Sequence, residues 1–423
     1  MTKPTARATL AWAFYDWANS AYAVAVMSAF FPIFFKEYWS HGVAAVESTF
    51  YLGVANSVAS LVIVVAAPVL GAIADRGGTR KRILLLFATL GVAMTAALYW
   101  VAKGEWFAAA ALYVAATVGF SGANVFYDSL LVSVAPEKRL DYVSALGYGL
   151  GYLGGGILFA ICVFMTVSPQ RFGLSGPGEA VRLSFIMVAV WWAVFSLPIF
   201  LWVPETRVRG GPRGAAAVAA GFRQLAHTFD KVRRLRVVFL FLVGYWLYID
   251  GVDTIVRMAI DYGLSLHFDP DSLIVALLIT QFVGFPAALA FGRLGERYGP
   301  KAGILIGIGV YIGVVLWAYR MQHVWEFYAL AVVVGLVQGG VQSLSRSFYA
   351  RIIPRDKASE FYGFYNMWGK FAAVLGPGMM GWFGVLTGSS RLAMLSIIVL
   401  FVFGAACLWV VDEQRGRKMA AEL

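Results

Sequence analysis

The sequence predicts an all-helical membrane protein with twelve transmembrane helices, and three observations support this fold class. Hydrophobic residues make up 60% of the 423 residues and charged residues only 13%, whereas charged residues average roughly 25% in soluble domains. The hydrophobic residues form long blocks, and about 20 apolar residues are enough for one helix to cross a bilayer. Almost all lysines and arginines lie between these blocks. A water-soluble protein built around a single core is therefore excluded.

The limits of the blocks follow from the charged residues, prolines and glycines that separate them. The first block contains Asp16 and Asn19 and continues beyond Phe35, so we interpret it as a retained span and not as a signal peptide. The twelve expected spans cover residues 11–36, 49–73, 82–102, 107–133, 142–167, 183–203, 237–262, 272–292, 302–320, 326–350, 359–386 and 392–411.

The basic residues predict the orientation of the chain in the membrane. Of the 34 lysines and arginines, 25 fall in the termini and every second loop, and only 6 fall in the opposite loops. Because cytoplasmic loops carry the excess of basic residues, we expect a multi-pass protein of a cell inner membrane with both termini cytoplasmic. The net charge of +11 is then explained by the bilayer surface, and no nucleic acid partner is expected.

The longest hydrophilic stretch, residues 204–236, divides the expected spans into two sets of six. We therefore expect an N-terminal bundle over 1–203, a cytoplasmic linker over 204–236 and a C-terminal bundle over 237–423. Part of the linker has apolar residues at helical spacing opposite arginines and lysines. It is either a basic amphipathic helix on anionic lipid or a charged loop.

The loops after the second and the eighth span repeat one pattern, which is a glycine, an acid–arginine pair four residues later and a following base. The glycine allows two helix ends to approach, and the acid can pair with a base or with the N-terminus of a neighbouring helix. We expect these loops to control the conformational change. Their residues are Gly71, Asp75, Arg76 and Arg80 in the first copy, and Gly292, Glu296 and Arg297 in the second.

Other positions repeat between the halves as well. Trp12, Asp16 and Asn19 correspond in spacing to Trp246, Asp250 and Asp253, and Asn124, Asp128 and Pro136 correspond to Gln342, Arg346 and Pro354. Parallel repeats of six spans are typical of one transporter class. The paired loops resemble the signature loop of the major facilitator superfamily, which implies a major facilitator fold of two pseudosymmetric six-helix bundles.

A closer resemblance rests on three segments, residues 14–22 (FYDWANSAY), 338–347 (QGGVQSLSRS) and 360–366 (EFYGFYN). They are similar to the branch of the superfamily that includes the fungal vacuolar amino acid effluxer linked to autophagy. The resemblance implies export of small solutes. It also implies that the first, fourth, seventh and tenth helices line a central cavity.

Seven charged residues lie away from the ends of the expected spans, where each costs a few kcal/mol and is rarely kept without a partner or a function. Six of the seven lie on the four helices that the resemblance places around the cavity. They are the main candidates for solute binding or ion coupling: Asp16, Asp128, Asp250, Asp253, Arg257, Arg346 and Lys370.

Several roles remain open for these residues. Asp253 and Arg257 are four residues apart, so they form either a structural ion pair or part of the cavity. Asp128 and Arg346 are expected at equivalent depths, where they could form a gate, a structural pair, or contacts to the ammonium and carboxylate groups of a zwitterion. Lys370 either faces the cavity or extends to the interface.

Asp16 is the expected coupling carboxylate, because its span contains no basic residue and Asn19 shares its face; the alternative is an aspartate that only packs helices. All four histidines fall in expected loops, so protons would move through carboxylates. Asn124 and Gln342 could bind solute by hydrogen bonds or hold helices together.

Other functions lack support in the sequence. Residues 149–154 match a dinucleotide fingerprint but lie inside an apolar span, where glycines at four-residue spacing instead favour close helix packing. The sequence shows no clustered histidines or cysteines for an enzyme, metal or cofactor site and no soluble signalling domain. We therefore expect a monomeric secondary active transporter that exports an amino acid-like solute by alternating access and is proton-coupled. The alternative is a sodium-coupled carrier for sugars or other organic solutes.

Overall fold

The computed structural model describes residues 5–205 and 235–422, and these residues are almost entirely helical. The expected linker, with its possible amphipathic helix, lies mostly outside the described residues. The main helices are α1 (Ala6–Ala21), α2 (Phe31–Phe34), α3 (Ala45–Gly77), α4 (Arg80–Ala97), α5 (Trp106–Val134), α6 (Leu140–Val167), α7 (Pro177–Trp202), α9 (Arg236–Ser265), α10 (Pro270–Tyr298), α11 (Pro300–Arg320), α12 (Val324–Ile352), α13 (Ala358–Thr387), α14 (Ser390–Leu395), α15 (Ile397–Val410) and α16 (Glu413–Ala421).

The spans expected from the sequence agree with these helices. Among the described residues, eleven helices are long and apolar enough to cross a membrane, and the remaining expected span, 359–386, falls within the 30 residues of α13. The all-helical membrane fold is confirmed. Many helices extend one or two turns beyond the expected limits, since polar residues at a helix end can reach the headgroup region without breaking the helix.

The first span contains a feature that no hydropathy pattern predicts. It runs from Ala6 to Trp39 without interruption, but Tyr22–Phe30 and Phe35–Trp39 are wound as π-helix. The wider winding is visible in the bond from the Phe31 N–H to the Val26 carbonyl, which spans five residues. Such π-helical turns are rare and often lie beside functional residues, and this one begins one and a half turns after Asp16.

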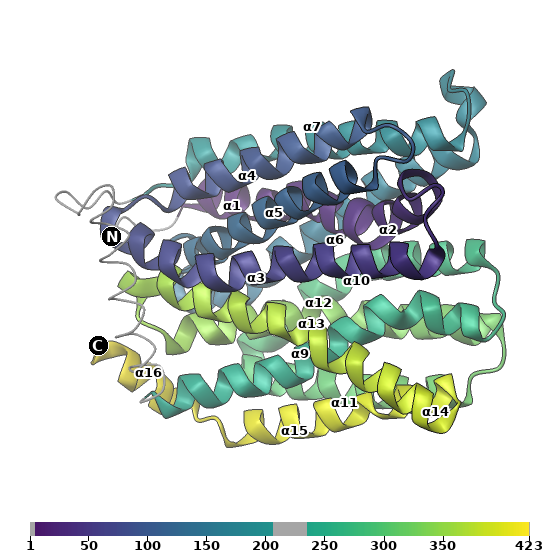
Figure 1. The fold of residues 1–423 in the computed structure, drawn as a ribbon. Helices are drawn as coiled ribbons and strands as arrows, with labels where there is room; N and C mark the ends of the chain where they lie inside the picture. Colours follow the sequence, from purple (N-terminus) through teal and green to yellow (C-terminus); the bar gives the residue numbers. More distant parts are fainter. Residues whose placement is uncertain (1–4, 206–234, 423) are drawn as a thin grey trace.

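The helices lie side by side, with those of the first half in the upper part of Figure 1 and those of the second half in the lower part. Both termini lie at the same end of the molecule (Figure 1). Two pairs of helices make most of the contact between the halves, α6 with α10 and α3 with α13. On the face of α6 toward α1, glycines permit close approach, since a Cβ at Gly155 would lie 3.1 Å from the Ser20 carbonyl oxygen.

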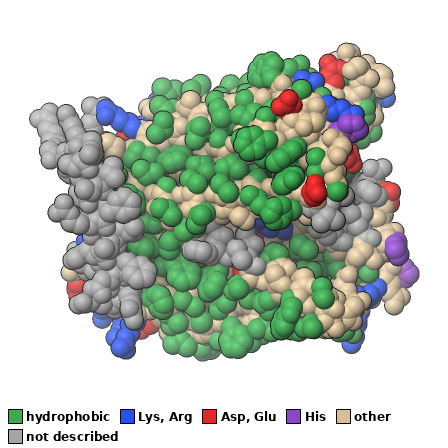
Figure 2. All heavy atoms as spheres, viewed as in Figure 1, with side chains coloured by type: hydrophobic (Ala, Val, Ile, Leu, Met, Phe, Trp, Pro, Cys, Tyr) green, Lys and Arg blue, Asp and Glu red, His purple; other side chains and the backbone are tan. Residues whose placement is uncertain are grey.

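Hydrophobic side chains cover the middle of the surface, while charged side chains gather toward the two ends of the helices (Figure 2). The exposed large side chains include Leu61, Leu86, Val194 and Phe403, which come from both halves. A soluble protein would not expose this much contiguous apolar surface. The band is the expected boundary with lipid acyl chains.

In each half of the molecule, a lysine caps the carbonyl end of the last membrane-spanning helix. The Lys81 ammonium group donates to the carbonyls of Phe200 (2.7 Å) and Val203 (2.6 Å) at the end of α7. The Lys301 ammonium group does the same for Trp409 (2.7 Å) and Val411 (2.8 Å) at the end of α15. The last carbonyls of a helix lack intrahelical partners and carry partial negative charge, so a lysine there satisfies them.

We predict that Lys81→Met and Lys301→Met each lower the free energy of unfolding by about 1–3 kcal/mol, because each removes hydrogen bonds from a charged donor to helix-end carbonyls. The measurement is the thermal unfolding midpoint in detergent, with Lys36→Met, at an exposed position, as the matched control. Equal midpoints for the control and the two variants would contradict this role.

Candidate functional site

The centre of the candidate site is Arg346, which α12 presents to the other half of the molecule. Its side chain is only 1% exposed, although it is among the largest in the protein. The groups around it come from α1, α5 and α6 of the first half. A guanidinium group buried in this way requires acceptors for its N–H groups, since an unpaired charge there would be very costly.

Two aspartates of the first half supply ionic partners. Nη1 of Arg346 donates to Oδ1 of Asp128 at 3.0 Å, and Nη2 lies 3.3 Å from Oδ2 of Asp16. The predicted meeting of Asp128 with Arg346 is thus found in the structure, and Asp16 joins the same group. Tyr127 donates from its hydroxyl to Oδ2 of Asp16 at 2.7 Å, and Asn366 donates to Oδ2 of Asp128 at 3.2 Å.

Uncharged groups complete the surroundings of the guanidinium. Nε of Arg346 donates to the Ser144 hydroxyl at 2.9 Å, and Nη2 donates to the Ser144 carbonyl at 2.8 Å. The rings of Trp12, Tyr127 and Tyr148 lie with their centroids 4.9, 5.3 and 4.3 Å from its Cζ atom. Aromatic faces attract cations, and desolvation strengthens the attraction.

A glycine of α6 makes room for this cluster. A Cβ atom on Gly147 would lie 2.6 Å from Oδ2 of Asp16, 2.8 Å from the Tyr127 hydroxyl and 3.0 Å from Nη2 of Arg346. Only glycine lets the α6 backbone approach the three groups this closely. The predicted packing role of Gly147 therefore extends to the site itself.

We call Arg346, Asp16 and Asp128 the central charge cluster. When both carboxylates are ionised, the cluster carries one negative charge in excess of its single positive charge. A proton, a cation or the ammonium group of a solute could balance that excess charge. The cluster also joins α12 to α1 and α5, so any separation of the two halves at this level must separate these charges.

Other predicted polar residues lie beside the cluster. Asn19, which we expected to hydrogen-bond Asp16, instead donates to the side-chain oxygen of Asn124 at 2.6 Å. Tyr127 and Arg346 are the partners of Asp16, both through Oδ2. Gln342 accepts from the Tyr152 hydroxyl at 2.9 Å, which gives a further hydrogen bond between α6 and α12.

Asp250 lies apart from the cluster, in contact with the backbone of α13. Its carboxylate accepts from the N–H groups of Leu375 (3.1 Å) and Gly376 (3.0 Å), directly before Pro377. The carboxylate of Asp250 therefore joins α9 to the backbone of α13 just before the proline inside that helix. The equivalence of Asp250 with Asp16 in the repeat therefore does not extend to their contacts.

The other predicted charges lie on α9 and α13. Asp253 is half-buried and Arg257 is exposed on α9. Lys370 lies in α13, and its side chain is outside the described residues. The structure thus brings together two of the predicted aspartates and one predicted arginine.

Residues that sequence reasoning did not place at the site are mainly uncharged. Ser144 and Tyr148 lie on α6, a helix without a charge at this depth, and Tyr127 directly precedes Asp128. Serine and tyrosine are common in membrane helices, so their presence alone gives no reason to select them. The four-residue spacing of the α6 glycines could have indicated which face of α6 packs against α1, and so which of its side chains lie near the site.

At the end that carries the termini, Asp75 connects the two halves. Its carboxylate accepts from Arg80 at 2.6 Å and from the backbone N–H groups of Ser359 (3.1 Å) and Glu360 (2.8 Å) at the start of α13. A Cβ on Gly71 would overlap the Ser359 carbonyl group. The first loop therefore caps a helix of the opposite half. The glycine lets the two helix ends approach, and the acid four residues later accepts the N–H groups at the start of α13.

Further contacts close the same end. Asp141 of α6 accepts from the Ser347 hydroxyl and from Nη2 of Arg351, both at 2.6 Å. The Ser129 and Ser359 hydroxyls are 3.1 Å apart, again between the halves. Together with Asp75 they form what we call the terminal gate: Asp75, Ser129, Asp141, Ser347, Arg351 and Ser359. The gate is closed in this structure.

The second copy of the loop makes a weaker connection. Glu296 lies 3.9 Å from Nε of Arg139, and both side chains are partly exposed. A Cβ on Gly292 would lie 2.6 Å from the Cβ of Ala145, so this glycine also permits close packing between the halves. Arg297 lies over the ring of its neighbour Tyr298, and the side chain of Arg76 is outside the described residues.

The arrangement of helices is that of the major facilitator superfamily, and two solved transporters show the same fold. The human organic anion transporter MFSD10 matches with a TM-score of 0.71 and 14% identity, over 95% of this chain and 99% of that one. The proton:xylose symporter XylE matches with a TM-score of 0.73 and 14% identity, over 98% of both chains. At 14% identity these two likenesses show that the fold is shared.

The family is identified by sequence. The family model described as "Vacuole effluxer Atg22 like" matches residues 4–421. An uncharacterised MFS-type transporter, YxiO of Bacillus subtilis, is 40% identical over 95% of this chain and 94% of its own. Autophagy-related protein 22 of Gibberella zeae is 30% identical over 66% of this chain and 46% of its own. The chain belongs to the Atg22-like family of the superfamily, as the three sequence segments predicted.

We predict that Asp75→Asn opens the terminal gate more often, because the amide loses the ion pair with Arg80 and one charge-assisted acceptor for the start of α13. If the free-energy difference between the closed and the open gate falls by only 1.4 kcal/mol, the ratio of open to closed molecules rises tenfold. The reporter is Ser129→Cys in a Cys407→Ala background, where Cys162 remains buried. The measurement is its rate of alkylation by a membrane-impermeant maleimide added to the side of the membrane that carries the termini.

Asp412→Asn serves as the matched control, because Asp412 caps the exposed start of α16 with hydrogen bonds inside the second half only. We expect alkylation several-fold faster with Asp75→Asn and unchanged with Asp412→Asn. Identical rates in the two variants would show that Asp75 does not hold the gate.

Proposed function

We propose that this transporter exports a small polar or zwitterionic solute, with amino acids as the first class, in exchange for protons. The observation that carries the proposal is the central charge cluster, in which one arginine of the second half is buried between two aspartates of the first. Membership of an effluxer family supports the direction, and the basic loops support an inner-membrane location with cytoplasmic termini.

Partner exchange explains why a zwitterion suits this cluster. When the terminal gate opens, α12 moves relative to α1 and α5, and Arg346 loses contact with the two aspartates. An uncompensated buried charge costs about 3–5 kcal/mol. A solute carboxylate can replace the aspartates at Arg346, and a solute ammonium group can replace the guanidinium at Asp16 and Asp128. The gate can then open without leaving charges unpaired.

The excess carboxylate explains the proposed coupling. A proton on Asp16 or Asp128 removes the excess negative charge, and it thereby removes the attraction for a solute ammonium group. A proton taken up from outside therefore favours release of the solute there. The orientation proposed above makes the closed terminal gate a state that faces outward, which is the state in which an exporter exchanges solute for protons.

A sodium-coupled carrier for sugars or other organic solutes is the second candidate. The observation that favours it is that two carboxylates contact one guanidinium, since paired carboxylates can also hold a monovalent cation. The fold likeness to a proton:xylose symporter and to an organic anion transporter does not select between solutes, because at 14% identity it concerns the fold alone.

We predict that Asp16→Asn uncouples transport from protons while keeping exchange of solute. Purified protein is reconstituted in liposomes and assayed with a panel of radiolabelled amino acids, first in counterflow and then with an acid interior. The unmodified protein should accumulate at least one amino acid when the interior is acid. In Asp16→Asn the counterflow should persist only at a higher solute concentration, because Asp128 stays ionised but the amide removes the excess negative charge that attracts the solute ammonium group. The pH gradient should no longer drive accumulation, because an amide binds no proton in this range.

Two variants make the assay specific. Arg346→Lys should lose counterflow as well, since a single ammonium group cannot replace the forked guanidinium contacts to Asp128 and Ser144. Asp412→Asn should behave like the unmodified protein. Accumulation driven by sodium and not by protons would favour the second candidate, and a normal pH response in Asp16→Asn would refute the coupling role.

A further inference from the structure

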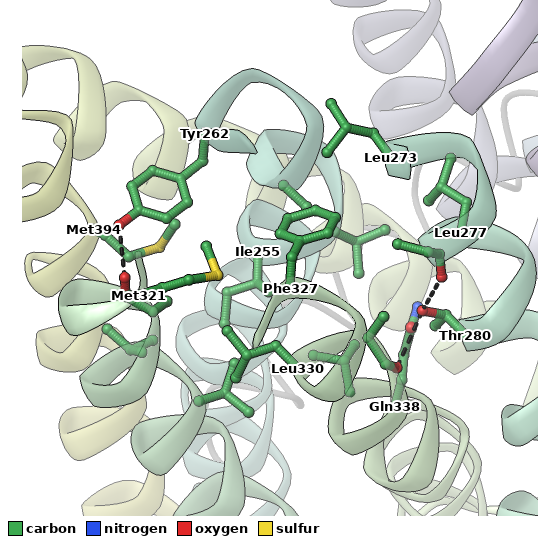
Figure 3. Close-up of a pocket in the computed structure, with 18 of the residues that line it drawn as sticks. Ile255, Tyr262, Leu273, Leu277, Thr280, Met321, Phe327, Leu330, Gln338 and Met394 are labelled. Atoms are coloured by element: carbon green, nitrogen blue, oxygen red, sulfur yellow. Dashed lines mark hydrogen bonds between the residues drawn. The ribbon is translucent and has the colours of Figure 1, made fainter. Parts of the chain in front are cut away.

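A pocket lies within the second half of the molecule (Figure 3). None of its described lining residues belongs to the central charge cluster. The pocket encloses about 800 Å³, with the open space at its mouth included. Its walls come from α9, α10, α11, α12 and α14, so the first half contributes none of the described lining residues. Met321, which joins α11 to α12, and Met394 of α14 place it toward the end opposite the termini.

The walls of this pocket are apolar and uncharged. Leu273, Leu277, Phe327 and Leu330 point into the region that Figure 3 shows, together with Met321. Among the described residues that line the pocket, none carries a formal charge. A charged ligand would lose its hydration there without compensation, so the pocket excludes ions and zwitterions. It therefore differs in chemistry from the site proposed for the transported solute.

The two hydroxyl groups in the walls already have partners. The Thr280 hydroxyl lies 3.0 Å from the Ala276 carbonyl and 3.2 Å from the Ala331 carbonyl, to which it donates. The Tyr262 hydroxyl donates to the Ala318 carbonyl at 2.7 Å. Both hydroxyl groups therefore donate to backbone carbonyls of the protein, so neither is available to donate a hydrogen bond to a ligand.

Two glutamine side chains, Gln281 of α10 and Gln338 of α12, also line the pocket, and the amide of Gln338 has an unsatisfied atom. Gln338 is 9% exposed, and its Oε1 atom has no hydrogen-bond partner among the described residues. Buried amide oxygens almost always have a partner, and an unsatisfied one costs free energy. A largely apolar pocket whose wall holds the unsatisfied Oε1 acceptor of Gln338 is suited to a largely apolar ligand that carries a hydrogen-bond donor.

We propose that this pocket binds an uncharged, largely apolar small molecule that donates one hydrogen bond to Oε1 of Gln338. The aromatic rings of Phe327 and Tyr262 and the aliphatic walls contact the apolar body of the ligand. The single donor distinguishes this ligand from a lipid acyl chain, which has none. The inference does not depend on the proposed export of amino acids, because the site lies in one half and involves none of the charged cluster.

Indole and N-methylindole form a matched pair of probes, since they differ chiefly in the N–H donor. Equilibrium dialysis of the full chain in detergent, with radiolabelled indole and with protein-free micelles as the blank, gives the affinity for each. We expect the unmodified protein to bind indole at least tenfold more tightly than N-methylindole. This comparison needs no variant, so it holds even if a substitution disturbs folding.

Three substitutions then locate the site. Gln338→Leu should remove the preference for indole, and Ala259→Phe should fill the pocket and abolish binding of both probes. Ala290→Phe adds the same ring at an exposed position of α10 and should leave binding unchanged. Arg346→Lys should also leave it unchanged, whatever it does to transport.

Four results would overturn the proposal. They are equal binding of the two probes by the unmodified protein, no binding of either, an unchanged preference in Gln338→Leu, and unchanged affinity in Ala259→Phe. Loss of indole binding in Arg346→Lys would place the ligand at the charge cluster and would overturn it as well.

Discussion

The constraint on which the structure depends is that a guanidinium group cannot be buried between membrane helices without acceptors around it. Arg346 satisfies that constraint only with groups from the other half of the molecule, namely Asp16, Asp128 and both oxygens of Ser144. The neighbouring helices are adapted to it, since Gly147 removes the side chain that would displace these groups. A single buried charge thereby fixes how α1, α5, α6 and α12 meet.

The internal repeat explains why two residues of opposite charge meet there. Asp128 and Arg346 occupy equivalent positions of the two halves, and equivalent positions on helices that face a pseudo-twofold axis come together at that axis. The same symmetry gives the matched lysines at the ends of α7 and α15. It is broken in the gate loops, where Asp75 is 6% exposed and caps α13 while Glu296 makes a longer, more exposed contact. By the same symmetry Glu296 would cap the start of α6. An acid of α6 itself, Asp141, lies there instead and is paired with Arg351.

Hydropathy and repeat spacing were sufficient to predict the number of spans and the fold, and to select Asp16, Asp128 and Arg346, which the structure brings into contact. They could do so because burying a charge in a membrane is costly enough to leave few such residues, and each is conspicuous. The same reasoning overestimated the likeness of Asp250 to Asp16, since spacing does not reveal that Asp250 accepts from backbone N–H groups of α13 while Asp16 contacts an arginine. It also missed Ser144 and Tyr148, because neutral side chains cost little to bury and do not stand out. No hydropathy or spacing pattern in the sequence predicts the π-helical winding that begins at Tyr22.

Alternating access requires two states that differ by only a few kcal/mol, since otherwise one of them would be too rare to be used. In the closed state at least three connections join charged groups to the opposite half, through Asp75 and Asp141 of the terminal gate and through Arg346 of the central charge cluster. If none were replaced on opening, their combined loss would exceed that range. Water at the headgroup level can solvate Asp75 and Asp141 once the gate separates, because both lie near the helix ends. Arg346 lies deeper, so its partners must be replaced by a ligand, and for this reason the solute and the coupling ion are expected to act at Arg346 and not at the gate loops.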